Sequence, residues 1–239
     1  MTATLTRDPE VLRIATYNVH DFLDDRAAAA RVVRAIAPDV LCLQEVPRRI
    51  TTEVRLPVFA CECGLYWSGG RLGSGGTAIL TDLRTRVHAA YVRRLPVRFP
   101  DRSRGYAALD VSLPGRLLVT VVSVHLGLKA PERVAHAEDL VGRIGARAVV
   151  AGDLNEVSDG PAYLVLSGRY RRVSEDRATF PAGHPTRALD VIFAGEGLEI
   201  VASGGPLGAL EDVAAGSDHV PVWVDVLPAP VAGEISGER

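Results

Sequence analysis

Cysteine is scarce in this chain, and its scarcity excludes a disulfide framework. The 239 residues contain three cysteines, Cys42, Cys61 and Cys63, whereas small domains held together by disulfides carry many more. Cys42 lies within the apolar run 40–43 and is expected to be a small buried hydrophobe. Cys61 and Cys63 would point to opposite faces of an extended segment, and the sequence offers no further soft ligands for a metal site there.

Aromatic residues and surplus positive charge are also sparse. Phe, Trp and Tyr make up 5% of the chain, so few rings are available to stack on bases. The formal net charge is −2 and the pI is about 6.3, whereas proteins that bind a nucleic-acid backbone usually carry a basic surplus. Both absences weigh against a nucleic-acid-binding protein, although a locally basic surface remains compatible with them.

Long apolar runs are missing too. No stretch reaches the roughly 18 apolar residues that span a bilayer, and residues 1–10 lack the apolar core of a signal peptide. Hydrophobic residues still make up 47% of the chain, which is enough for a large buried core. We therefore expect a cytoplasmic protein with one domain over 11–227, between a flexible N-terminus at 1–10 and a flexible tail at 228–239.

What is present is an alternation of short apolar runs with amphipathic stretches, the pattern of an α/β fold. Asp24 or Asp25 can cap a first helix, which Pro38 would end. Helices are expected at 26–36, 131–145 and 161–166, and strands at 11–19, 39–44, 76–81, 87–96, 106–111, 117–124, 148–151, 189–193 and 220–226.

Six short polar motifs each follow a hydrophobic run. A strand that ends in a carboxylate, amide or imidazole places a polar group at the rim of a buried sheet, so six such ends predict one convergent site. Their side chains suit a hard divalent cation and attack on a phosphate ester. The motifs contain Asn18 (Thr-Tyr-Asn-Val), Glu45 (Leu-Gln-Glu-Val), His125 (Ser-Val-His-Leu), Asp153 and Asn155 (Gly-Asp-Leu-Asn), Asp190 (Ala-Leu-Asp-Val), and Asp218 and His219 (Ser-Asp-His).

The order of these motifs resembles the endonuclease/exonuclease/phosphatase family of metal-dependent phosphoesterases. That family includes pancreatic-type deoxyribonuclease, abasic-site endonucleases, inositol-polyphosphate phosphatases, neutral sphingomyelinases and deadenylases. The resemblance runs from about Ile14 to Val224. It implies a deoxyribonuclease-like four-layer α-β-β-α sandwich, in which two packed sheets are flanked by helices, and it implies Mg²⁺ or Mn²⁺ as cofactor.

The resemblance assigns three residues to the metal. Glu45 would bind the ion, and Asn18 and Asp218 would lie beside it. Because Mg²⁺ takes few protein ligands and keeps several waters, a carboxylate at a strand end suits it. Taken singly, these residues could also be ordinary capping or turn residues. His20 is close to Asn18 and could line the rim of the site.

The remaining motifs would supply the catalytic residues. Asp153 could orient and activate the attacking water, and Asn155, which would point the same way in an extended stretch, could donate to a phosphoryl oxygen. His219 would contact the phosphate or act as general base, with its ring held by Asp190. His125 matches the Ser/Thr-His-Leu motif of several branches, where it would stabilise the transition state or protonate the leaving oxygen.

An arginine-rich stretch precedes the strand expected at 106–111. Guanidinium groups bind phosphate bidentately, and family members often place an arginine at the start of this strand. The resemblance therefore assigns Arg104, with Tyr106, to substrate binding, although a solvated basic loop fits the sequence equally well.

The sequence thus predicts a metal-dependent hydrolase of phosphoric esters. A phosphomonoester or phosphodiester of a small molecule or lipid headgroup is favoured, because the chain is small and poor in aromatic and basic residues. A nuclease acting on DNA or RNA is the alternative. The Pro-Asn sequence of the abasic-site branch is missing, which disfavours base-excision repair. A non-catalytic binding protein on this fold would be expected to have lost site residues, and all of them are present.

Overall fold

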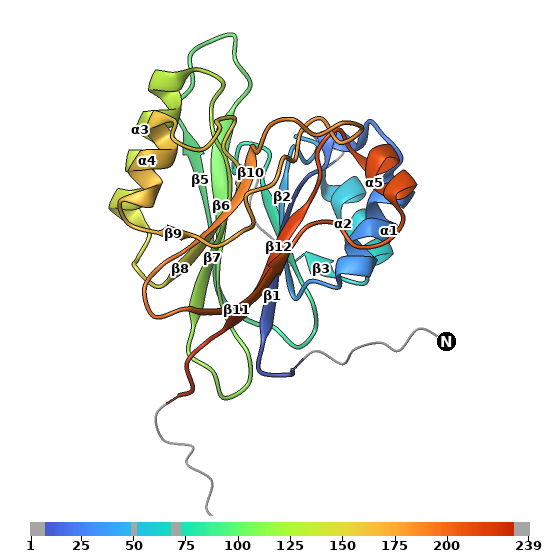
Figure 1. Cartoon of the computed structure of the whole chain (residues 1–239), viewed down its shortest axis with the longest axis vertical. Coiled ribbons are helices and arrows are strands. Elements are labelled where there is room, and N and C mark those ends of the chain that lie inside the picture. The colour runs from blue at the N-terminus through green and yellow to red at the C-terminus, as the bar shows by residue number, and fades with distance from the viewer. Residues whose placement is uncertain (1–7, 49–51, 68–72, 232–239) are drawn as a thin grey trace, which may run out of the picture.

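The computed structural model describes residues 8–48, 52–67 and 73–231, and most of the predicted flexible ends lie outside these ranges. Within the described residues, two six-stranded sheets pack face to face, and helices cover their outer faces (Figure 1). The predicted four-layer sandwich is therefore confirmed. None of the described helices is both long and apolar enough to cross a membrane.

The first sheet combines both ends of the chain. Its order is β11-β12-β1-β2-β4-β3, with β1 parallel to β2 and β12 antiparallel to β1. The strand nearest the C-terminus is thus a direct neighbour of the first strand. The bounds are β1 Leu12–Asn18, β2 Val40–Gln44, β3 Tyr66–Trp67, β4 Ala78–Thr81, β11 Glu199–Gly204 and β12 Val222–Leu227.

The second sheet comes from the middle of the chain. Its order is β5-β6-β7-β8-β10-β9, with β7 parallel to β8 and the other pairs antiparallel. Apolar residues such as Ile14, Val121 and Val149 fill the space between the sheets. The bounds are β5 Arg86–Leu95, β6 Arg104–Ser112, β7 Val119–His125, β8 Ala148–Asp153, β9 Arg171–Arg172 and β10 Asp190–Ala194.

The helices form the two outer layers. α1 (Arg26–Ile36), α2 (Thr52–Cys63) and α5 (Leu210–Gly216) lie beside the first sheet, and α3 (Ala130–Arg143) and α4 (Pro161–Ser167) lie beside the second (Figure 1). The predicted bounds of α1 are confirmed. The Asp25 carboxylate accepts the N–H groups of Ala27 and Ala28 and so caps the helix, and Ala37 ends it in a left-handed conformation.

Several elements are absent from the sequence predictions: α2, α5, β3, β9, β11 and the short 3-10 helix η1 (His20–Phe22). α2 was not expected because it contains Pro57 and lacks a clear amphipathic period. The extended conformation assumed for Cys61 and Cys63 is wrong, because both lie on α2. Cys61 is exposed there and Cys63 is buried.

Candidate functional site

The polar motifs meet where two pairs of parallel strands end. Asn18 is the register partner of Gln44 at the end of β1 and β2, and His125 is the partner of Asp153 at the end of β7 and β8. Asp190, at the start of β10, also pairs with Asp153. Parallel strands end at the same edge of a sheet, so the topology brings these side chains together.

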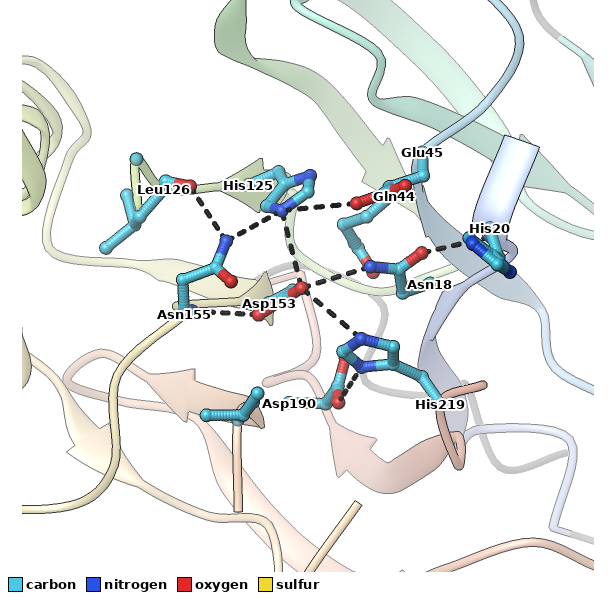
Figure 2. A network of polar contacts seen from close by, with 12 residues as sticks. Asn18, His20, Gln44, Glu45, His125, Leu126, Asp153, Asn155, Asp190 and His219 are labelled. Atoms are coloured by element: carbon cyan, nitrogen blue, oxygen red, sulfur yellow. Dashed lines mark hydrogen bonds and ion pairs between the residues drawn. The ribbon is translucent and has the colours of Figure 1, made fainter. Parts of the chain in front are cut away.

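Asp153 lies at the centre of the resulting network (Figure 2). Its Oδ1 accepts the Asn155 backbone N–H at 2.8 Å, and its Oδ2 accepts the Asn18 side-chain amide at 3.0 Å across the two sheets. The His125 and His219 Nε2 atoms lie 3.4 and 3.8 Å from the same Oδ2. Burial and the neighbouring Asp190 raise the pKa of Asp153 to about 6, against the lowering effect of His219 and the two donors. This carboxylate can therefore exchange a proton near neutral pH.

His219 is held by Asp190, as the sequence predicts. Nδ1 of the imidazole lies 2.8 Å from Oδ2 of Asp190, and both side chains are buried. Burial alone would lower the pKa of His219, but Asp190, with further help from Asp153 and Asp218, raises it to about 10. The ring is therefore a cation at neutral pH, which favours contact with an anionic phosphate over the role of general base.

Thr179, in the segment that precedes β10, fixes the orientation of this pair. Its Oγ1 accepts the backbone N–H groups of Leu189 and Asp190 at 3.1 Å. The Phe180 ring then packs on the His219 imidazole, with 4.8 Å between the ring centroids. The segment preceding β10 thus holds both members of the pair in place.

The Asn155 side chain contacts His125 instead of pointing the same way as Asp153. Asn155 adopts a left-handed conformation with φ 51°, so the extended geometry assumed for 153–155 is wrong. Its side-chain amide donates to the Leu126 carbonyl at 3.1 Å and lies 2.9 Å from His125 Nε2. Nε2 is then an acceptor, which is consistent with the pKa of His125, lowered far below its usual value by burial and by Arg104 and Arg48. A neutral His125 orients Asn155, and its acid role stays a prediction.

The predicted metal residues fall into two neighbouring groups. Glu45 follows β2 with φ 53°, and its Oε1 lies 3.9 Å from His125 Nε2, so it faces Asp153. Asn18 joins the same group through Asp153, while its Oδ1 accepts the His20 N–H at 3.1 Å. Asp218 lies instead at the half-exposed rim, 3.9 Å from His20 Nδ1. Within the described ranges, the two clusters that could hold an ion are His20, Asp24 and Asp218, and Asp153, Asp190 and His219.

Gln44 is a positioning residue that the sequence interpretation missed. Its Oε1 accepts the Thr16 hydroxyl at 3.1 Å, and its Nε2 donates to Ser123 Oγ at 3.0 Å. The Ser123 hydroxyl in turn donates to the Leu43 carbonyl at 2.9 Å. This fully buried bridge joins β2 to β7 directly beneath the site. A glutamine at the end of an otherwise apolar strand was the available signal.

Of the two predicted substrate-binding residues, the structure brings one to the site. Arg104 is buried at the start of β6, and burial lowers its pKa while the nearby carboxylates of Glu45 and Asp153 favour its charged form. Tyr106 packs in the outer layer, among side chains that contact α3 and α4. Its charged neighbours are Asp139, Arg93 and Arg143, so it does not join the other predicted site residues.

Comparisons with known proteins identify the family and the fold. Residues 15–219 match the family described as the endonuclease/exonuclease/phosphatase family, whereas no curated protein matches the sequence. One similar structure is an endonuclease/exonuclease/phosphatase from Bacteroides vulgatus, with 18% identity and a TM-score of 0.74, covering 92% of this chain and 99% of that one.

Two further structures resemble this fold. A mannosyl-6-phosphatase of Bacteroides thetaiotaomicron is 16% identical with a TM-score of 0.71, covering 90% of this chain and 99% of that one. The human Nocturnin catalytic domain, which has a bound sulfate anion, is 17% identical with a TM-score of 0.67, covering 92% and 95% of the two chains. At these identities the likeness establishes the shared fold.

Proposed function

This chain belongs to the endonuclease/exonuclease/phosphatase family, and from that premise we propose that it is a divalent-metal-dependent hydrolase of phosphoric esters. The observation that carries the proposal is the buried cluster in which His219, held by Asp190, faces Asp153 across 3.8 Å. A cation beside a carboxylate with a raised pKa provides a phosphate contact and a proton acceptor in one site. The phosphatase activity and the bound sulfate of two similar structures support the choice of a tetrahedral anion.

The donor atoms of the site fit Mg²⁺ or Mn²⁺. Carboxylate oxygens of Glu45 and Asp153 lie 3.9 and 3.4 Å from the same His125 nitrogen. Oδ1 of Asp190 is buried without a donor among the described residues. Oxygen-rich sites of this kind suit hard divalent cations. Glu45 and Asn18 are the residues we assign to the ion, with Asp218 beside them at the rim. When bound, the ion would polarise a phosphoryl oxygen and stabilise the leaving oxygen.

Asp153 is the proposed base for the attacking water. Its Oδ1 and Oδ2 are fixed by the Asn155 and Asn18 donors, so a water that donates to this carboxylate is held in one direction. The water oxygen forms the new bond to phosphorus as the ester bond breaks, and its proton passes to Asp153. A base with a pKa near the working pH is best suited to this transfer. No Gly-x-Ser-x-Gly motif supplies a competing nucleophile.

Two cationic hydrogen-bond donors, His219 and Arg104, would stabilise the negative charge that develops on the phosphoryl group. Nε2 of the His219 cation is free of Asp190 and points toward Asp153 (Figure 2), so its proton can be shared with a phosphoryl oxygen. Arg104 adds a second cation near Glu45 and Asp153. These groups are preorganised by buried contacts and need little rearrangement when the substrate binds.

The proposed substrate is a phosphomonoester or phosphodiester of a small molecule or lipid headgroup. The net charge of −2 and the 5% aromatic content support this choice over long nucleic acids. Hydrolysis of DNA or RNA is the second candidate. It is supported by the arginines near Glu45, which include Arg48 and Arg104.

The test is a hydrolysis panel with Mg²⁺ or Mn²⁺ and four substrates: p-nitrophenyl phosphate, bis-p-nitrophenyl phosphate, plasmid DNA and sphingomyelin. Replacing Asp153 by Asn or His219 by Ala is expected to lower kcat by roughly 10²–10⁴-fold, because each removes a proton acceptor or a charge-stabilising donor. His88→Ala is the matched control, because His88 is exposed on β5 and contacts Ser112. Near-full hydrolysis by either site variant would contradict the assignment, as would metal-independent turnover by the wild type.

The metal assignment has a test that does not depend on turnover. Mg²⁺ or Mn²⁺ should raise the Tm of the wild type, because a ligand that binds only the folded state stabilises it. Glu45→Gln removes one charge while keeping the size of the side chain, so the metal-induced shift in Tm should shrink or vanish. Glu53→Gln, on the surface of α2, is the control and should keep the full shift. An unchanged shift in Glu45→Gln would place the ion elsewhere.

A further inference from the structure

Arg48 has two buried donor atoms that no described residue accepts. It lies three positions after Glu45, and its Nη1 donates to the Ser103 carbonyl at 2.9 Å. Its Nε and Nη2 are buried and have no hydrogen-bond partner within the described part of the chain. Leaving charged donors buried and unpaired costs free energy. Burial, together with Arg104 and Arg102, also lowers the pKa of Arg48, so a nearby anion would reduce the electrostatic cost of this buried charge.

The backbone around Arg48 is shaped to admit this guanidinium. Gly76 has φ 92°, and a Cβ atom at this position would lie 2.3 Å from Arg48 Nε. Only glycine therefore leaves room for the side chain in its present position. The Gly76 carbonyl also accepts the Val46 N–H at 3.0 Å, which ties this turn to the segment after Glu45.

Arg104, which interacts electrostatically with both Arg48 and the site carboxylates, provides a third unpaired donor atom. The Arg104 side chain is buried, and its Nη1 has no acceptor among residues 8–48, 52–67 and 73–231. Arg104 lowers the pKa of Arg48, while the carboxylates of Glu45 and Asp153 favour the charged form of Arg104. The unpaired donor atoms thus belong to two neighbouring arginines, of which Arg104 is close to Glu45 and Asp153.

A pocket of about 430 Å³ opens beside Arg48. Two of its residues are held in place, because Arg102 pairs with Asp21 at 2.7 Å and Arg55 donates to the Phe22 carbonyl at 3.0 Å. The Asp21 N–H donates to the Glu45 carbonyl at 2.8 Å, so the pocket adjoins the proposed metal residue. We call it the arginine pocket, and its lining residues are Asp21, Leu23, Pro47, Arg48, Arg55, Arg102 and Ser103.

We propose that the arginine pocket binds a second phosphate group of the substrate, next to the phosphate that is hydrolysed at Asp153. Three arginines and one aspartate line the pocket, so its lining carries a net positive charge, and guanidinium is the side chain best suited to phosphate oxygens. The inference rests on the proposed phosphoesterase function in treating the second phosphate as part of the substrate. It selects substrates with two nearby phosphates: a small bisphosphate, or two successive phosphates of a nucleic-acid strand.

The first test measures binding without catalysis. Isothermal titration without divalent cations compares methylphosphonate with ethane, propane and butane bisphosphonates, whose P–C bonds resist hydrolysis. At least one bisphosphonate should bind the wild type about tenfold or more tightly than methylphosphonate, which corresponds to one extra charge-assisted contact. Arg48→Ala and Arg102→Ala should remove this preference.

Two controls keep the binding test decisive. Arg31→Ala removes the same charge from the surface of α1, where Arg31 pairs with Asp212, and it should keep the preference for bisphosphonates. Arg102 is exposed, so its variant tests the pocket without the risk of misfolding that attends a buried arginine. Equal binding of methylphosphonate and every bisphosphonate would overturn the proposal, and so would an undiminished preference in both pocket variants.

A second experiment separates the two sources of the phosphate. With metal present, thymidine p-nitrophenyl phosphate diesters with and without a second phosphate on the sugar are compared with short oligonucleotides. Faster turnover of the doubly phosphorylated diester assigns the pocket to small bisphosphates, and faster turnover of the oligonucleotides assigns it to a nucleic-acid strand. If no substrate turns over, the proposed function fails while the titration still decides whether the arginine pocket binds a second phosphate.

Discussion

His136 shows how one buried side chain fixes the loop that follows β7, the strand that ends in His125. Its Nε2 lies 2.6 Å from the Pro96 carbonyl, and its Nδ1 accepts the Gly127 N–H at 3.3 Å. Because Nδ1 accepts, the ring is neutral and carries its proton on Nε2. Burial accordingly lowers the pKa of His136, in opposition to the hydrogen bond that Nε2 donates to the Pro96 carbonyl. This histidine, which received no predicted role, joins α3 to the backbone just beyond His125.

The first prediction follows from the sign of that shift. Below about pH 6.5 the unfolded chain protonates His136 while the folded chain does not, so the unfolded state binds more protons and stability falls as the pH decreases. The free energy of unfolding should therefore fall less steeply in His136→Gln than in the wild type between about pH 8 and about pH 5. Urea denaturation across this range measures it, with His184→Gln, an exposed histidine, as control. Parallel curves for wild type and His136→Gln would contradict the assignment.

At the scale of elements, β8 approaches β7 so closely that one position requires glycine. A Cβ atom on Gly152 would lie 1.9 Å from the Val124 carbonyl oxygen, in the strand pair that carries His125 and Asp153. Close backbone approach of this kind is a recurrent reason for glycine inside a strand. The glycine of the Gly-Asp-Leu-Asn motif is therefore required for steric reasons, whereas its Asp153 and Asn155 contribute polar groups to the site.

Gly152→Ala is accordingly expected to destabilise the fold by roughly 1–3 kcal/mol through overpacking, and to lower kcat because Asp153 is displaced. Chemical denaturation and initial rates measure the two effects. Gly142→Ala on α3 is the control, because a Cβ there meets no atom within 4 Å, and alanine should stabilise the helix by about 0.5–1 kcal/mol. Equal stability of the two variants would show that β8 has room to move.

The elements also show where sequence reasoning succeeds. α1 has local signals at both ends, a capping Asp25 and Pro38 after its last turn, so its bounds could be predicted. α2 has Pro57 in its middle and a weak amphipathic pattern, so its sequence does not announce a helix. The assignment of Tyr106 met a different obstacle. Side chains alternate along a strand, so Tyr106 and Ala107 point to different faces of the second sheet. Only the packing of that sheet decides which face lies against the helices.

At the scale of the whole molecule, the site depends on the contact between two sheets. Gln44 from the first sheet donates a fully buried hydrogen bond of 3.0 Å to Ser123 from the second. Removing Gln44 alone leaves the Thr16 and Ser123 hydroxyls short of a partner. We expect Gln44→Ala to lower the free energy of unfolding by at least about 1–3 kcal/mol for each buried group left unsatisfied.

A double-mutant cycle tests this bridge. Gln44→Ala combined with Ser123→Ala should cost less than the sum of the single variants, because the second change removes a group that the first left unpaired. Chemical denaturation gives the four free energies. Additive effects would mean that the two side chains do not stabilise the sheet contact together. Thr120→Ser, which keeps a hydroxyl near Asp110 away from the bridge, serves as the control for β7.

The sequence could indicate that strand ends carry the site, because each motif follows an apolar run. It could not supply the contacts between sheets, such as the bond from Asn18 to Asp153, because the relative placement of two sheets depends on the packing of the whole core. The sequence could not indicate the unpaired donors of Arg48 for the same reason. An arginine after Glu45 looks like any surface arginine until the turn at Gly76 closes over it.

The pairing of β1 with β12 also determines when the protein can begin to work. Leu12 lies opposite Val226 in the finished sheet, so on a ribosome the first strand remains without this neighbour until residues 222–227 have been synthesised. His219 and the Ser217 hydroxyl, which donates to the Asn18 carbonyl at 2.7 Å, arrive with the same late segment. A nascent chain therefore has an incomplete site and exposes an unpaired strand edge, a natural target for chaperones during translation.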